Sequence, residues 1–163
     1  MKVLKFLDAK LEEYLMTVLT IVMTALIFLQ VVMRYIFKDS PAWTEELSRY
    51  LFLWAIWIGA SYGVKTQSHV RLTVLTSRLS KKVQDVINVV VWFLWLAFTI
   101  FLVTKGFELV SIFLASGQTS TAMHIPMWIA YASVPVGCTL MAFRLLQNAY
   151  FAIRNYKKEK EAD

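Results

Sequence analysis

Cysteine and histidine are scarce in this chain of 163 residues, and their scarcity excludes several classes of site. Cys138 is the one cysteine, so an internal disulfide, a CxxC redox pair and a multi-thiolate metal site are all impossible. Its position inside an apolar run favours a small packing residue. The two histidines, His69 and His124, lie at opposite ends of apolar runs, too far apart to share a haem or a metal. With no nucleophile–base pair or phosphate loop in view, we expect neither an enzyme nor a bound cofactor or metal.

Charge is also scarce, and its absence is concentrated in long runs. Charged residues make up 17% of the chain and apolar residues 58%, whereas soluble domains average about 25% and about 45–50%. The net charge is +6, but the basic residues flank the apolar runs rather than forming one patch. They therefore indicate membrane topology and contact with lipid headgroups, and we expect no nucleic-acid partner. Composition predicts a membrane protein.

Four segments can cross a bilayer, whose core of about 30 Å needs about 20 helical residues. The charge-free part of the second, residues 50–64, is too short to span alone, so that span must carry Glu45, Glu46 and Arg49 near one membrane surface. The first run is too long for the ~7–15 residues of a signal-peptide core, and no small-residue cleavage site follows it, so we expect a retained span. The sequence predicts one all-α domain over residues 1–163, with transmembrane helices at 14–33, 41–64, 86–104 and 126–146.

Prolines and small polar residues set two of these boundaries. Asp39-Ser40-Pro41 is typical of a helix start, with a capping residue before a proline. The polar cluster 116–121 breaks the long charge-free run that follows Leu109, and Pro126 suits the start of the last helix. Pro135 predicts a kink within that helix.

Two further segments have amphipathic periodicity. In residues 75–85 the apolar side chains fall on one helical face and the basic ones on the other, which predicts a short helix lying in the headgroup plane. Residues 3–13 have the same pattern. They form either a second helix of this kind or a cytoplasmic extension of the first span. Most lysines and arginines lie at the two termini and between the second and third spans. The positive-inside rule therefore predicts that both termini face the cytoplasm.

The second span is unusual because it begins with charges: Trp43 is followed by Glu45, Glu46 and Arg49. Both glutamates are spaced to pair with Arg49 on one helical face, three and four residues apart. One interpretation is a solvated cluster that stabilises the helix start. The other is a partly buried pair that fixes a contact with another chain, which would explain the tryptophan and the third charge. The pattern leaves both open.

Deep tryptophan pairs occur in two spans, Trp54 with Trp57 and Trp92 with Trp95. Tryptophans concentrate at membrane interfaces, so pairs in the middle of a span indicate helix packing or a broad lipid-facing surface. Packing within this chain is the favoured interpretation. Gly59 and Gly63 form a small-xxx-small pair that would let another helix approach.

The segment Arg34–Arg71 resembles the small membrane subunit, the Q or DctQ type, of tripartite ATP-independent periplasmic (TRAP) transporters. The first span ends in Arg34-Tyr35, Trp-x-Glu-Glu-x-x-Arg opens the second, an aromatic run leads into Gly59-Ala60, and His69-Val70 follows. Length, four spans and cytoplasmic ends fit the same family. The remaining spans resemble it only in hydropathy.

The resemblance implies a non-catalytic subunit of the bacterial inner membrane. It would brace a large (M-type) transport subunit in sodium-driven uptake of an organic acid, of the sialic acid or C4-dicarboxylate class, delivered by a periplasmic binding protein. Membrane lipids would be its other partners. The residues implied as structural or interface positions are Arg34, Trp43, Glu45, Glu46, Arg49, Trp54, Trp57, Gly59, His69 and Arg71. The alternative is a self-contained small transporter or channel that works as a homo-oligomer.

Overall fold

The computed structural model describes residues 2–39, 41–66 and 80–162, and its elements are all helices. They are α1 (Lys2–Tyr35), α2 (Ala42–Lys65), α4 (Lys81–Ser116), α5 (Trp128–Tyr131) and α6 (Ser133–Ala162). Three stretches are long and apolar enough to cross a membrane, Lys10–Tyr35, Val83–Ser116 and Trp128–Ala152. The predicted all-α membrane protein is therefore confirmed, with three of the four expected spans.

α2 is not among these three stretches. It has 24 residues, which is long enough, but Glu45, Glu46 and Arg49 occupy its first two turns and Lys65 ends it. The helix begins at Ala42, and Pro41 is its extended N-cap residue (φ −65°, ψ 118°) rather than its first helical residue, one position later than the sequence predicted. α2 is therefore a helix of sufficient length, but its charged residues make it less apolar than the other three stretches.

The helix that contains the predicted third span is longer than that span. α4 starts at Lys81 and continues past Thr104 to Ser116, so residues 81–85 form its first turn rather than the end of a separate interfacial helix. The rest of that predicted helix, apart from Ser80, lies outside the described residues. Lys105 and Glu108 do not interrupt α4 because they pair with each other along it, with Nζ and Oε2 2.7 Å apart. Gly117, with φ of 62°, ends the helix in the left-handed conformation that glycine adopts at helix ends.

The last predicted span is interrupted. Pro126 pairs with Thr119 in an isolated β-bridge rather than starting a helix, and the short α5 follows. Ala132 separates α5 from α6, three residues before Pro135. A proline removes the hydrogen bond to the carbonyl four residues earlier and displaces it, which accounts for the break at Ala132, while the kink predicted at Pro135 stays a prediction. α6 then runs to Ala162, well beyond residue 146.

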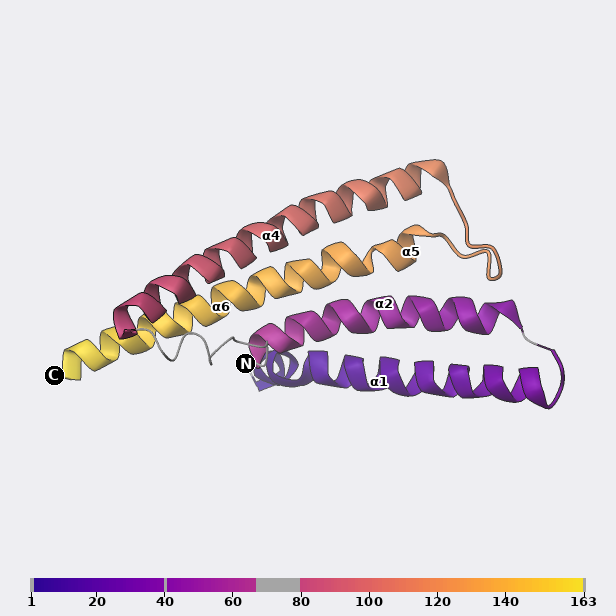
Figure 1. Cartoon of the computed structure of the whole chain (residues 1–163), viewed down its shortest axis with the longest axis horizontal. Helices are drawn as coiled ribbons and strands as arrows, with labels where there is room; N and C mark the ends of the chain where they lie inside the picture. Colours follow the sequence, from indigo (N-terminus) through magenta and orange to yellow (C-terminus); the bar gives the residue numbers. More distant parts are fainter. Residues whose placement is uncertain (1, 40, 67–79, 163) are drawn as a thin grey trace.

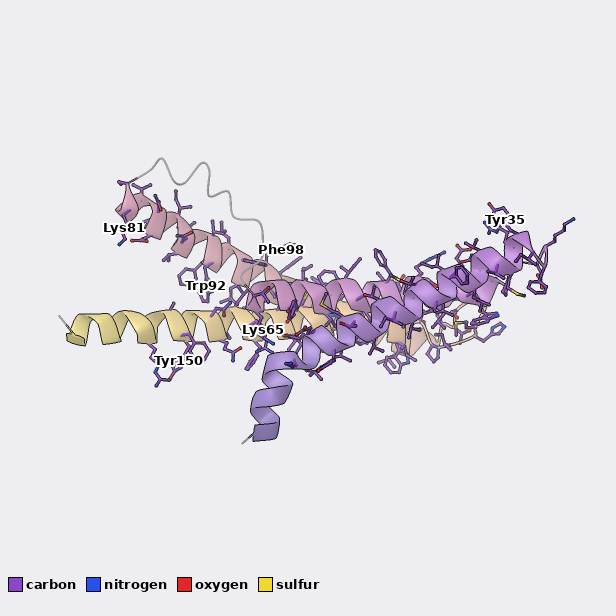
Figure 2. The ribbon with its side chains drawn as sticks, turned by 90° about the horizontal axis from the view of Figure 1, so that it is seen from below. Tyr35, Lys65, Lys81, Trp92, Phe98 and Tyr150 are labelled. Atoms are coloured by element: carbon purple, nitrogen blue, oxygen red, sulfur yellow. The ribbon has the colours of Figure 1, made fainter. Side chains whose placement is uncertain are left out.

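The four long helices lie side by side in one open layer, in the order α1, α2, α6, α4 (Figure 1). Both termini lie at one end of the layer, here called the terminal end. The α1–α2 turn and segment 117–127 lie at the other, the loop end. The predicted amphipathic segment 3–13 is continuous with the first span in α1, whose N-terminal turns bend away from the layer (Figure 2).

The most buried apolar cluster lies where α2, α6 and α4 meet. Val64, Met141 and Leu145 form it, and Trp92 and Trp95 pack against it. The Trp92 indole N–H also donates a hydrogen bond to the Leu145 carbonyl at 3.2 Å. Packing within the chain, the favoured interpretation of this tryptophan pair, is confirmed. The edge helices α1 and α4 instead present most of their large apolar side chains outward.

Candidate functional site

The charged cluster predicted at the start of α2 divides into two parts with different roles. Glu45 and Arg49 form the expected i,i+4 ion pair, 2.9 Å apart, with side chains 57% and 65% exposed. An exposed helix pair of this kind contributes only about 0.3–0.5 kcal/mol. Within this chain, Arg49 and Glu45 therefore match the solvated interpretation.

Glu46 is instead turned toward the loop end of α4 and α5. Its carboxylate accepts hydrogen bonds from the Tyr50 hydroxyl at 2.6 Å and from the backbone N–H groups of Ala122 and Met123 at 2.8 and 3.1 Å. Segment 117–127 is tightly turned there, with a bridge between Thr119 and Pro126. Charge-assisted bonds to adjacent N–H groups are stronger than neutral ones. Glu46 thus fastens α2 to the connection between α4 and α6.

We expect Glu46→Gln to loosen segment 117–127 without unfolding the helices. A glutamine keeps the size of the side chain but loses the charge that strengthens its bonds, at a cost of roughly 1–2 kcal/mol. Hydrogen–deuterium exchange of the amides of Ala122 and Met123 should then be about tenfold faster. Glu45→Gln is the matched control and should leave this exchange unchanged. Equal exchange in both variants would contradict the role assigned to Glu46.

The other predicted positions in α2 make packing contacts. The Trp54 indole N–H donates to the Ile129 carbonyl at 3.2 Å, which joins α2 to α5. Trp57 packs against Gly137 of α6, where an added Cβ would lie 2.5 Å from the Trp57 Cβ. Gly59 faces Met16 of α1, 3.3 Å from an added Cβ to the methionine methyl. The glycine predicted to admit another helix thus admits α1.

Of the remaining predicted residues, two lie in the described parts of the chain. Trp43 lies in the first turn of α2 and is 41% exposed. Arg34 lies in the last turn of α1 with an exposed side chain. His69 and Arg71 lie outside the described residues. An interface role for any of these positions stays a prediction.

A second polar site, which the sequence did not predict, lies toward the terminal end. Glu12 of α1 is only 2% exposed, and its Oε1 lies 3.0 Å from Nε of Arg144 in α6. Ser61 of α2 donates its hydroxyl to the same oxygen at 2.9 Å, and Lys65 Nζ lies 3.4 Å from Oε2. Two cations from two helices therefore meet one buried carboxylate, which links α1, α2 and α6. Figure 2 shows Lys65 beside α1 at this level.

Two further bonds extend this ion network along α6. Arg144 also donates from Nη1 to the Gln147 side-chain oxygen at 2.7 Å. Asn148 donates its amide to the Val64 carbonyl at 2.8 Å, near the end of α2. Because the lysines and arginines that flank the spans were interpreted as topology signals, the sequence did not predict the burial of Arg144 or its contact with Glu12. Helical spacing offered one signal for Glu12. It lies four residues before Met16 and therefore shares the face of α1 that packs against Gly59 of α2.

The chemistry of both sites is that of attachment. In the described ranges, no group of three or more histidine, cysteine, aspartate or glutamate side chains could hold a metal ion. Glu46 is held by hydrogen-bond donors, and Glu12 by cations and a hydroxyl. These carboxylates fix helices to one another at the two ends of the layer.

Comparison with known proteins gives one consistent family. Residues 23–155 match the family described as tripartite ATP-independent periplasmic transporters, DctQ component. The chain is 31% identical over 93% of its length to the isethionate TRAP transporter permease protein DctMQ of Oleidesulfovibrio alaskensis, and covers 25% of that protein. It is 29% identical over 90% of its length to the C4-dicarboxylate TRAP transporter small permease protein DctQ of Vibrio cholerae, of which it covers 72%. It is 29% identical over 85% of its length to the sialic acid TRAP transporter permease protein SiaT of Haemophilus influenzae, covering 22% of that protein.

Proposed function

Because this chain belongs to the DctQ component family of the tripartite ATP-independent periplasmic transporters, we propose that it braces a larger transport subunit in the uptake of an organic acid. Membership makes it a small permease subunit of the inner membrane and not an enzyme. Bracing, the driving ion and the substrate are the parts that we propose.

The observation that carries the bracing role is the open layer of helices (Figure 1). In the edge helices, the most apolar stretches within residues 10–35 and 83–116 have almost no residues that are buried inside the chain. Such surfaces must meet lipid or another membrane protein. The carboxylates of Glu12 and Glu46, meanwhile, hold the helices of the layer together. A wide, internally fastened layer is suited to enlarge the fixed part of a transporter whose other part moves.

Two of the relatives support a separate large partner. The chain spans only about a quarter of the DctMQ and SiaT proteins, both of which are named permease proteins without the word small. We infer that the remaining length in those proteins corresponds to a transport subunit that this chain meets as a second polypeptide. A periplasmic substrate-binding protein would complete the system.

Charges and helix length support four spans with both termini in the cytoplasm. Along α2, Glu46 and Lys65 are about 28 Å apart at ~1.5 Å per residue, close to the thickness of a bilayer core of about 30 Å. α2 would then cross between Glu46 at the loop end and Lys65 at the terminal end. The terminal end carries most of the lysines and arginines, so we assign it to the cytoplasm.

The proposed substrate is an organic acid carried on a sodium gradient. The three relatives are named for isethionate, C4-dicarboxylate and sialic acid. All three are organic anions, which supports that class. They do not favour the sialic acid system over the C4-dicarboxylate one for this chain.

The test is to express the tagged chain in its native host and extract the membranes with a mild detergent. We expect a much larger membrane protein to co-purify in about a one-to-one ratio. In liposomes, the pair should take up substrate from its binding protein only under an inward sodium gradient, and the chain alone should carry no flux. Recovery of the chain alone, or flux through it alone, would instead favour the small homo-oligomeric transporter.

A matched variant tests the cluster on α2 in the same assay. Arg49→Ala removes an exposed charge whose loss should leave the chain itself folded. If the cluster contacts the large subunit, co-purification should fall while the melting temperature of the isolated chain stays the same. Unchanged co-purification and uptake would leave only the solvated interpretation.

A further inference from the structure

An ion pair on α4 lies on the face that the rest of the chain leaves uncovered. Lys105 Nζ and Glu108 Oε2 are 2.7 Å apart, and both side chains are 59% exposed. Gly106, between them, is turned the other way, where an added Cβ would lie 2.9 Å from the Pro135 ring of α6. The pair therefore projects away from α6.

Contacts between neighbouring helices place this pair midway along the layer. Gly106 meets Pro135, and two residues further along α6 Gly137 meets Trp57 of α2. Trp57 lies about 16 Å from Glu46 and about 12 Å from Lys65 along the helix axis. Glu46 and Lys65 bound the proposed membrane crossing of α2. The Lys105–Glu108 pair is thus near the middle of the bilayer rather than at the surface where the sequence placed it.

Lipid tails are a poor environment for such a pair. Charged side chains in the centre of a membrane almost always face protein or a water-filled cavity, because hydrocarbon offers them no hydrogen-bonding partner. The surrounding side chains, including Phe101, Phe107 and Ile112, are apolar and exposed, so they extend the same uncovered surface. Thr104 and Ser111 add hydroxyls to it, bonded to the carbonyls of Phe101 and Glu108. By contrast, residues 14–33 of α1 contain no charged side chain.

We propose that this face of α4, defined by Thr104, Lys105, Glu108, Ser111 and Ile112, is covered by a transmembrane helix of the large transport subunit. The inference rests on the proposed function, and it assigns the interface to α4 rather than to the apolar face of α1. The partner helix would be apolar with at least one polar side chain at the level of the ion pair. The exposed face of α1 would remain in contact with lipid.

The test uses a photo-crosslinking amino acid in the intact, co-purified complex, at Ile112 of α4 or at Ile27 of α1. These positions are 56% and 45% exposed and carry the same side chain, so they form a matched pair. After irradiation, we expect an adduct with the large subunit from position 112 and only lipid adducts from position 27. An adduct from 27 but not 112, or a dimer of this chain from 112, would overturn the assignment to α4.

A charge variant gives an independent measurement. Glu108→Leu leaves Lys105 without its partner at the interface, and we expect the yield of co-purified large subunit to fall about tenfold, whereas the melting temperature of the isolated chain should hardly change. Unchanged co-purification in this variant, with no adduct from position 112, would reject the α4 interface while leaving the proposed function intact. If the unmodified chain brings down no large membrane protein at all, the proposed function itself fails.

Discussion

Replacing Arg144 with leucine is expected to lower the melting temperature of the chain by about 10 °C. The change leaves the Glu12 carboxylate, which is only 2% exposed, without its closest cation. Removing one partner of a buried ion pair costs about 3–5 kcal/mol, and each kcal/mol corresponds to about 2–4 °C in a chain of this size. Cys138 provides the measurement, because it is buried and is the single cysteine. A thiol-reactive dye should label it only as the detergent-solubilised chain unfolds.

Two further variants show whether burial, rather than charge alone, causes this loss. Arg49→Leu makes the same substitution at an exposed pair, and we expect no measurable change in melting temperature. The double variant Glu12→Leu/Arg144→Leu should melt above Arg144→Leu, because both buried charges are then replaced by apolar groups. If Arg144→Leu melts like the unmodified chain, the ion network does not hold the three helices together.

The sequence located the long helices but not where they end, and it did not show which charges are buried. Apolar runs located α1, α4 and α6. The polar cluster that begins at Ser116 breaks the helix as predicted, because glycine and short polar side chains disfavour helix locally, but α4 reaches it instead of ending near residue 104. Arg144 and Lys65 fit the positive-inside pattern whether or not they are buried. Their burial depends on which helix faces Glu12. That is a property of the layer, and no local pattern contains it.

The charged cluster at the start of α2 illustrates the same limit. Helical spacing predicted that Glu45 could reach Arg49, and the two side chains do meet. It also allowed Glu46 to pair with Arg49, whereas Glu46 bonds to the N–H groups of residues far along the chain, Ala122 and Met123. Spacing within a helix identifies possible partners on that helix, but it cannot identify partners from distant parts of the chain. Long-range donors with fixed geometry outcompeted a flexible exposed arginine.

Gly137→Ala is expected to separate α2 from α6 and to destabilise the chain by about 2 kcal/mol or more. The added Cβ would lie 2.5 Å from the Trp57 Cβ and 2.9 Å from both the backbone carbon and oxygen of Trp57. Backbone atoms in a helix cannot move aside as a side-chain end can, so the two helices must shift apart. Overpacking of this kind costs about 1–3 kcal/mol and occasionally more. It outweighs the gain of about 1 kcal/mol from replacing glycine by alanine within a helix.

Gly59→Ala is the matched control for this prediction, because it makes the same substitution in the interior of α2. There the nearest atoms are the methyl and sulfur of Met16, 3.3 and 3.6 Å from the added Cβ, and a methionine side chain can adjust. We expect the control to melt at or slightly above the temperature of the unmodified chain, and Gly137→Ala to melt about 5–10 °C below it. Similar melting temperatures for the two variants would show that α2 and α6 are not in close contact at Gly137.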